Sequence, residues 1–187
     1  MDVHSASLEA PWKIVDRDTP ELRAQDPNLQ LNGGIYVSNE AWDDYQAERR
    51  ELLEHLIAYG VRNVVFNSGH THIYLASELQ PDFDDPVSPV AAFDFTTGSQ
   101  TADPDPRTIA PEDVLHLAEQ VMLDANTPYL RHVDLLNQGY AVVDVTPEEL
   151  VVQFRVLDTF DPDAEARTAA RFRILNGGRT MDVELLP

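Results

Sequence analysis

The spacing of apolar residues predicts two helices in the first two thirds of the chain. Between residues 39 and 59, apolar side chains recur at intervals of three and four, and Gly60 follows as a C-terminal cap. A second such stripe runs from Pro111, which suits the first turn of a helix, to Ala125. The side chains expected to face the core are Tyr45, Leu52, Leu53, Leu56 and Ile57 in the first helix, and Val114, Leu117, Val121 and Met122 in the second.

Short apolar runs rich in β-branched residues predict strands between and after these helices. Two runs, at 63–67 and 90–97, lie between the helices. Four more runs span 140–145, 150–157, 169–175 and 180–186. The first and last of their connectors have hairpin chemistry and the middle one is an acidic loop, which indicates an antiparallel meander. A helix followed by a strand and a glycine turn is typical of a sheet covered by helices. We therefore expect an α+β fold with an α/β-type core and a terminal antiparallel meander.

No linker or internal repeat divides the chain. Residues 1–40 show an irregular pattern, and residues 81–89 and 98–106 have the composition of loops. We expect one domain over residues 1–187 with an irregular N-terminal segment over 1–40. No apolar run is long enough to span a bilayer, and no signal peptide is visible in the sequence, so we expect no membrane partner.

The charge of the chain narrows the range of partners. Asp and Glu number 33 and Lys and Arg 13, which gives a net charge of −20. Because binding to duplex nucleic acid requires Lys and Arg to neutralise phosphates, we expect none. Lys13 is the single lysine, and an acidic surface poor in lysine predicts adaptation to high salt, which screens self-repulsion. A GC-rich genome is an alternative reason for arginine in place of lysine, although it leaves the acid excess unexplained.

The sharpest chemical feature is Gly69-His70-Thr71-His72, which follows the strand predicted at 63–67. Gly69 is expected to supply a tight turn there. Neutral imidazole is a common ligand of zinc, manganese and iron. Ligand sites in α/β sheets collect beyond the carboxyl ends of strands, so His70 and His72 are candidate metal ligands. The alternative is a pair of surface-loop histidines that bind nothing.

The remaining histidines in the first two thirds give weaker signals. Asp2 and His4 form an Asp-x-His pattern, but no strand precedes it, and chance is the better explanation. His55 and His116 lie within the two predicted helices, where a surface or partly packed position is expected.

Candidates outside these positions are few. Arg131 and His132 stand in a predicted loop before a strand, where anion binding is one interpretation and an ordinary loop position the other. Acidic pairs such as Asp84-Asp85 are most simply solvated surface. The sequence lacks a nucleophile elbow, a phosphate-binding loop, a dinucleotide fingerprint and a His-Glu-x-x-His motif. It also has no cysteine, which excludes thiolate metal sites and cysteine nucleophiles.

Several stretches follow one another in a distinctive order: Trp42–Leu53, Asn63–Phe66, Gly69–His72, Ala76–Leu79, Gly139–Glu148 and Val156–Thr159. This order resembles the alkaline phosphatase D (PhoD-like) family of metallophosphoesterases. In that family a helix, an Asn-Val-Val-hydrophobic strand, a Gly-Asp-x-His metal motif and a small-residue helix follow one another. A Gly-Tyr-x-Val-hydrophobic-Asp-hydrophobic-Thr-Pro-Glu string and a Val-Asp-Thr segment come later. The similarity covers roughly residues 10 to 175.

Two departures from the family pattern stand out. Position 70 is His where the family usually has Asp, which gives the Gly-His-x-His ending of the wider calcineurin-like metallophosphoesterases. The family's earlier Asp-x-His, Gly-Asp-x-x-Tyr and Gly-Asn-His motifs, which supply most of the metal ligands, have no counterpart in residues 1–40. The family's amino-terminal all-β domain and export signal have none either.

The resemblance implies the C-terminal portion of a calcineurin-like metallophosphoesterase sandwich, incomplete on its own. It implies hydrolysis of small phosphate esters by a metal centre, with calcium and iron in some members and zinc or manganese as alternatives. His72 is then the first expected metal ligand and His70 the second. The missing N-terminal part of the enzyme becomes an expected partner. The competing hypothesis is a non-catalytic binding or structural module that retains the scaffold.

Overall fold

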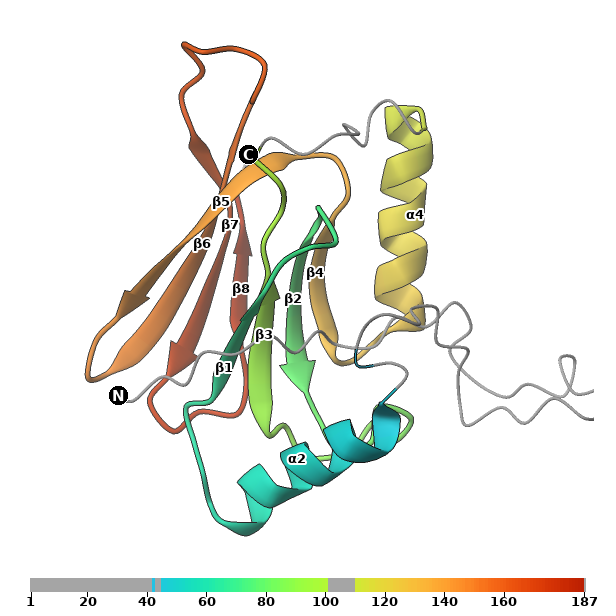
Figure 1. Ribbon diagram of the computed structural model, residues 1–187, viewed down its shortest axis with the longest axis vertical. Helices are drawn as coiled ribbons and strands as arrows, with labels where there is room; N and C mark the ends of the chain where they lie inside the picture. Colours follow the sequence, from blue (N-terminus) through green and yellow to red (C-terminus); the bar gives the residue numbers. More distant parts are fainter. Residues whose placement is uncertain (1–41, 43–44, 101–109, 187) are drawn as a thin grey trace, which may run out of the picture.

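The computed structural model describes residue 42 and residues 45–100 and 110–186 of the chain. These residues form two helices and two four-stranded sheets (Figure 1). The elements are α2 (Gln46–Ala58), β1 (Val65–Ser68), β2 (Tyr74–Leu79), β3 (Ala92–Thr96), α4 (Glu112–Ala125), β4 (Leu130–Asp134), β5 (Gln138–Val145), β6 (Glu149–Leu157), β7 (Arg167–Leu175) and β8 (Asp182–Leu185). Both predicted helices and the mixed α+β class are confirmed.

The two sheets are connected in different ways. The first has the strand order β1-β3-β2-β4, with β1 parallel to β3 and the other pairs antiparallel. The second has the order β5-β6-β7-β8, in which each strand pairs antiparallel with the next one along the chain. The predicted meander is therefore confirmed, including its first turn, where Thr146 N–H donates to the carbonyl of Glu149.

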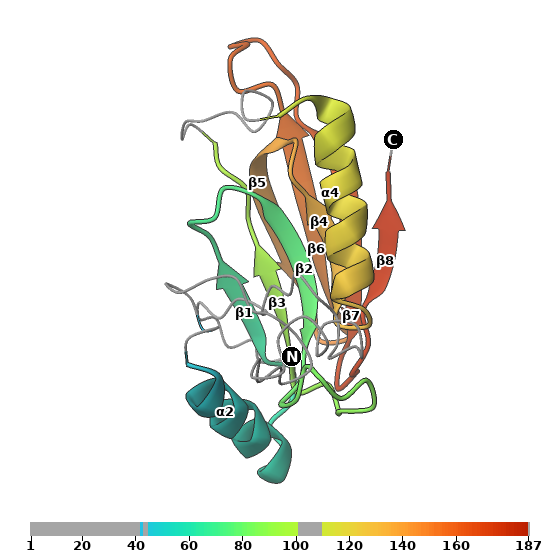
Figure 2. The ribbon, with the colours of Figure 1, turned by 90° about the vertical axis from the view of Figure 1, so that its right-hand side faces the viewer.

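The sheets pack face to face around an apolar core (Figure 2). Strict alternation of buried and half-buried residues along β6 directs one of its faces into this core. Three aromatic rings meet at its centre: Phe154 lies 4.7 Å from Tyr74 and 4.8 Å from Phe172, measured between ring centroids. Aromatic side chains bury about 150–250 Å² each, so these rings contribute strongly to the core.

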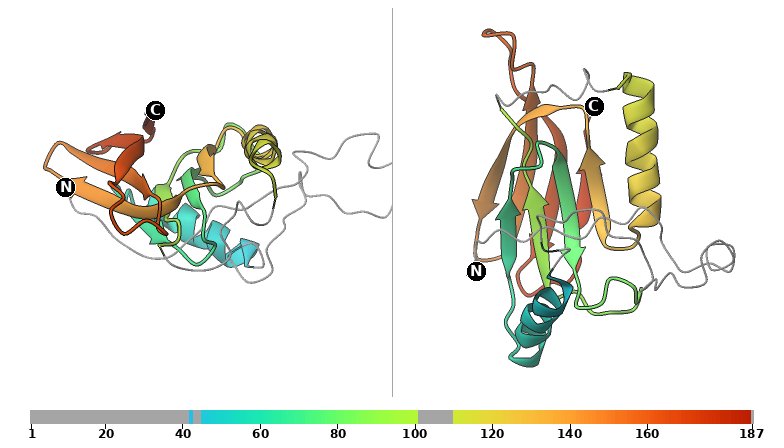
Figure 3. Two further views of the ribbon diagram at one scale, coloured as in Figure 1. Left: turned by 90° about the horizontal axis from the view of Figure 1, so that it is seen from above. Right: turned by 45° about the vertical axis from the view of Figure 1, so that its right-hand side comes forward.

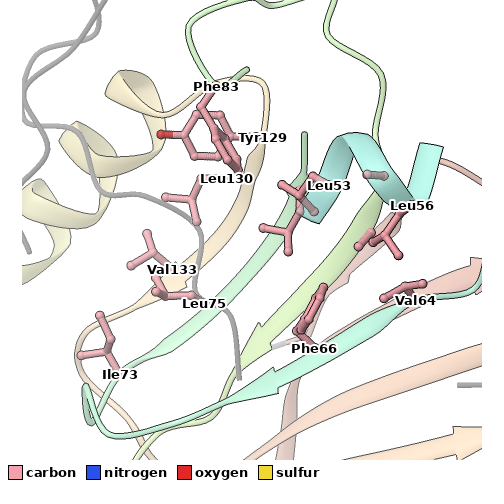
Figure 4. Packing of buried hydrophobic residues seen from close by; sticks show 13 residues of the cluster. Leu53, Leu56, Val64, Phe66, Ile73, Leu75, Phe83, Tyr129, Leu130 and Val133 are labelled. Atoms are coloured by element: carbon pink, nitrogen blue, oxygen red, sulfur yellow. The ribbon is translucent and has the colours of Figure 1, made fainter. Parts of the chain in front are cut away.

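Both helices cover the opposite face of the first sheet, as the view from above shows (Figure 3). Figure 4 shows Leu53 and Leu56 of α2 on the side of the sheet where Val64 and Phe66 lie, in the same cluster as Leu75. Gly60 adopts a φ of +66° just after α2, so the predicted glycine cap is confirmed. The described part of the molecule is thus a helix layer and two sheets, with a core on each side of the first sheet.

Of the apolar stripe predicted for α4, Met122 packs against the core of the first sheet, whereas the other three residues do not. Val114, Leu117 and Val121 are 48%, 60% and 54% exposed, whereas Leu115 is buried. The Glu119 carboxylate accepts the Leu135 backbone N–H at 2.8 Å, so the side of α4 that carries Glu119 lies next to the end of β4.

Two further local predictions were also wrong. Ala76–Leu79, expected as a small-residue helix, belongs to β2, all six residues of which are buried between β3 and β4. His132, expected in a loop, lies inside β4 opposite Ala76. In both cases pairing with distant strands decides the conformation, and local propensity does not record it. The expectations for residues 1–40, with Asp2 and His4, lie outside the described residues.

Candidate functional site

The candidate site is the loop that joins β1 to β2 and carries Gly69-His70-Thr71-His72. Because β1 and β3 are parallel, their carboxyl ends meet at one edge of the first sheet, with Ser68 opposite Thr96. The Thr97 backbone N–H donates to the Ser68 carbonyl at 3.0 Å and joins the two strand ends. His70 is exposed and His72 half-buried directly beyond this edge. The structure thus brings both histidines to the place where α/β sheets collect their ligands.

The backbone of this loop is strained at the histidines themselves. His70 has a φ of +78° and His72 a φ of +63°, in the left-handed region that side chains with a Cβ disfavour. Gly69, which we expected to make the turn, has no such φ and open space around it. Left-handed residues other than glycine cost about 1–3 kcal/mol each and cluster at functional sites. This strain favours a functional explanation of the histidine pair.

A buried carboxylate links the ends of the two strands next to the loop. Asp94 in β3 is fully buried, and its two oxygens accept hydrogen bonds from the Ser68 hydroxyl at 2.7 Å and the Thr96 hydroxyl at 3.0 Å. These bonds hold the ends of β1 and β3 together just before the histidines. Sequence reasoning missed Asp94; the available signal was the polar pair Asp94 and Thr96 within an apolar strand.

The residues described around the loop do not form a complete metal centre. Imidazole nitrogens suit zinc, manganese or iron, and the buried Thr71 hydroxyl lacks a hydrogen-bond partner among the described residues. However, no group of three or more His, Asp or Glu side chains within residues 45–100 and 110–186 is arranged to hold an ion. His70 and His72 therefore supply at most part of a metal site.

Comparison with known proteins decides the family. A family model described as PhoD-like phosphatase matches residues 3–154, most of the chain. The chain belongs to the PhoD-like phosphatase family. The match includes the histidine loop and the first strand of the meander, β5.

Two relatives of this PhoD-like chain are much longer than it is. Alkaline phosphatase D of Bacillus subtilis (strain 168) is 27% identical over 153 residues, which cover 78% of this chain and 24% of the relative. A solved structure titled "Structure of PhoD" matches with a TM-score of 0.70 at 21% identity, over 97% of this chain and 31% of that one. The structural match shows the fold alone. The chain thus spans about a quarter of the curated relative.

The anion-binding candidates of the PhoD-like chain lie away from the histidine loop. His132 packs between the sheets, with its ring 5.7 Å from Phe154 and 5.5 Å from Phe172. Burial lowers the pKa of His132, so the neutral ring is favoured there, although the nearby Asp134 charge opposes this. Arg131 lies 3.7 Å from the carboxylate of Glu78. The contacts of both side chains are therefore structural, and neither residue belongs to the candidate site.

The two helical histidines of the PhoD-like chain occupy surface positions, as expected. His55 is exposed on α2 and stacks on Tyr59 at 4.3 Å between ring centroids. His116 on α4 contacts the Glu119 carboxylate at 2.9 Å, and this hydrogen bond raises the pKa of His116. No helix among the described residues is long and apolar enough to cross a membrane.

Proposed function

We propose that this chain is the C-terminal portion of a calcineurin-like metallophosphoesterase sandwich. In this proposal it belongs to a metal-dependent alkaline phosphatase or phosphodiesterase that hydrolyses small phosphate esters. Membership of the PhoD-like phosphatase family supports the chemistry. The observation that carries the proposal is the strained pair His70 and His72 at the edge where β1 and β3 end.

His70 and His72 would act as metal ligands in this function. Calcium with iron follows from the family resemblance, and the two imidazoles suit zinc or manganese as well. Such ions, when bound, hold phosphate oxygens and lower the pKa of a coordinated water. Since the described residues hold no group of three or more His, Asp or Glu side chains arranged around an ion, the remainder of the enzyme is proposed as the partner that completes the centre.

A non-catalytic binding or structural module is the second candidate. The incomplete ligand set among the described residues favours it. It predicts that neither histidine binds metal, even when the rest of the domain is supplied.

Metal binding by the purified chain tests the proposal directly. We expect weak binding of Mn²⁺ or Zn²⁺ in titration calorimetry, with loss of binding in His72→Ala and a partial loss in His70→Ala. His55→Ala is the matched control, because His55 is an exposed histidine on α2 and outside the loop. Binding that survives in His72→Ala, or that His55→Ala abolishes equally, would contradict the proposed ligands.

Turnover separates the incomplete enzyme from a self-sufficient one. We expect the isolated chain to hydrolyse neither p-nitrophenyl phosphate nor its bis ester above background, because two-metal sites need ligands around ions about 3.5–4 Å apart. Robust metal-dependent turnover by the isolated chain would show that other residues complete the centre.

We expect no binding of duplex DNA, given the net charge of −20.

We also propose that the acidic surface is adapted to high salt. With a net charge of −20, self-repulsion should unfold the chain in dilute buffer. At about 1 M KCl the Debye length falls to about 3 Å, and the structure should return. Far-ultraviolet circular dichroism in the two buffers checks this, and identical spectra would refute it.

A further inference from the structure

Strand β5 forms an exposed apolar edge of the second sheet. Among the residues that the structure describes, it pairs only with β6 (Figure 1). Val142, Val143 and Val145 are 36%, 39% and 47% exposed. A long, apolar edge strand without a partner is a template for pairing with another strand, and proteins normally protect such edges.

Two of these valines point toward the core between the sheets. In the antiparallel register, Val143 lies opposite Val152 and Val145 opposite Leu150. Residues directly opposite each other share one face of a sheet, and both partners on β6 are fully buried. The core face of the second sheet therefore continues onto β5, where Val143 and Val145 remain partly exposed.

The backbone of the same residues faces the open edge. The Thr146 N–H donates to the Glu149 carbonyl, so the groups of Thr146 point toward β6. Alternation along an antiparallel strand then directs those of Val142 and Asp144 toward β6 as well. Those of Ala141, Val143 and Val145 point outward. The Gly139 N–H fits this alternation, since it donates away from β6 to the carbonyl of Ser99.

The length of the relatives indicates what covers this edge. The chain accounts for 24% of the curated relative and 31% of the matched solved chain, so most of a PhoD-like phosphatase lies outside it. A second copy of this chain is the alternative occupant, and the concentration dependence of protection in the isolated chain distinguishes it.

We infer that β5 is a strand-addition surface for the part of a PhoD-like phosphatase that this chain does not span. That part supplies an extended segment, which pairs with the outward groups of Ala141, Val143 and Val145 and covers the two core-facing valines. This inference rests on the proposed function, since it names the surface at which the remainder of the enzyme docks.

A hybrid enzyme tests the inference. This chain replaces the matched 153 residues of Bacillus subtilis alkaline phosphatase D, and the hybrid is compared with the isolated chain. Amide hydrogen exchange at Ala141, Val143 and Val145 is expected to slow by about tenfold or more in the hybrid. Amides of β7, which has a neighbour on both sides, are the internal reference.

Two proline variants one residue apart provide the matched control. Val143→Pro removes an N–H that points to the open edge, so it should lower the melting temperature of the hybrid and leave that of the isolated chain nearly unchanged. Val142→Pro removes an N–H directed at β6 and should destabilise both proteins.

Each outcome bears on the inference. Equal exchange in the hybrid and the isolated chain would overturn it, as would equal effects of Val143→Pro on both. Concentration-dependent protection of β5 in the isolated chain would also overturn it, because the occupant would be a second copy. A hybrid that hydrolyses p-nitrophenyl phosphate while β5 exchanges fast would support the proposed function and refute this inference. A hybrid in which β5 is protected from exchange but which does not hydrolyse the substrate would support this inference and contradict the proposed function.

Discussion

The two sheets of this molecule bury different kinds of side chain. Among the described residues of the second sheet, Gln138 of β5 is the one buried polar side chain. Every buried residue of β6 and β7 is apolar, and these two strands face the first sheet with alternating side chains. The strands of the first sheet instead bury six polar or charged residues, namely Ser68, Ser77, Glu78, Asp94, Thr96 and Asp134. Buried polar groups cost free energy unless they are hydrogen-bonded.

This difference indicates that the second sheet mainly stabilises the fold and that the first sheet positions the histidine loop. The second sheet is a sequential meander whose inner face supplies apolar area. The first sheet is assembled from non-sequential strands, and its hydrogen bonds hold the strand ends beneath the histidine loop. We therefore expect substitutions in the second sheet to change global stability most, and substitutions at the edge of the first sheet to act on the loop.

Removal of a central aromatic ring should have the largest effect. Phe172 is fully buried between the sheets. Phe172→Ala should lower the free energy of unfolding by about 3–5 kcal/mol, through lost burial and a cavity. Chemical denaturation followed by circular dichroism measures this. The control Phe160→Ala removes a ring that is 72% exposed and should change stability by less than about 0.5 kcal/mol. Comparable losses in both variants would refute the assignment of stability to this core.

Loss of the Asp94 carboxylate should have a smaller, more local effect. Asp94→Ala leaves the buried hydroxyls of Ser68 and Thr96 without their present acceptor, which costs about 1–3 kcal/mol. Amide exchange in residues 69–72 should accelerate more than exchange in β6. Asp94→Asn is the matched variant, since its amide oxygen keeps one acceptor and should restore part of the stability. Uniform acceleration across both sheets would mean that Asp94 has no particular role at the loop.

The elements that could be predicted from sequence are those fixed by local pattern. Helical periodicity located α2 and α4, and the Thr146–Glu149 turn located the first hairpin of the meander. Strand β2 was missed because Tyr-Leu-Ala-Ser-Glu-Leu shows no alternation, as it is buried on both faces. Its Glu78 is accommodated by the backbone N–H of Met181, 103 residues away. No local pattern can record such a partner.

The candidate site divides in the same way. The His-x-His motif and its position after a strand were visible in the sequence, and the structure places both histidines at the predicted edge. The role of Asp94 could not be predicted, because Asp94 contacts Ser68, 26 residues away, only once β3 pairs with β1. The metal ligation itself stays a prediction.

The buried histidine of β4 should make the core between the sheets sensitive to acid. Burial lowers the pKa of His132 below its usual value of 6.5. The unfolded chain therefore takes up a proton first as the pH falls below about 6.5, and the stability that His132 contributes above this pH is progressively lost. Burial also raises the pKa of Glu78, which has the opposite effect on stability at lower pH. The measurement is therefore the difference between the wild type and His132→Phe in denaturation midpoints from pH 7.5 to 5. The Phe variant should lose less stability on acidification, and parallel curves would exclude His132 as the cause.

Relief of the backbone strain in the histidine loop should give the smallest change in stability, and one of opposite sign to the losses expected in the cores of the sheets. Glycine adopts a φ of +63° without the steric cost that a Cβ brings, so His72→Gly should raise the free energy of unfolding by about 0.5–1 kcal/mol. The same variant should lose the weak metal binding proposed for the chain.

Asn63 provides the control for this gain, because its φ of +59° is nearly the same. Its side chain accepts the Gly177 N–H at 2.7 Å and donates to Asn176 at 2.9 Å, so Asn63→Gly gives up two hydrogen bonds that offset the relief of strain. Asn63→Gly should therefore bring no gain. Hydrogen bonds of the fold explain why an asparagine is left-handed at position 63. If His72→Gly stabilises the protein, the left-handed histidine costs stability, and a functional role would explain why it is there. Equal responses of the two positions to glycine would remove that distinction, and with it the argument from strain for a metal ligand at position 72.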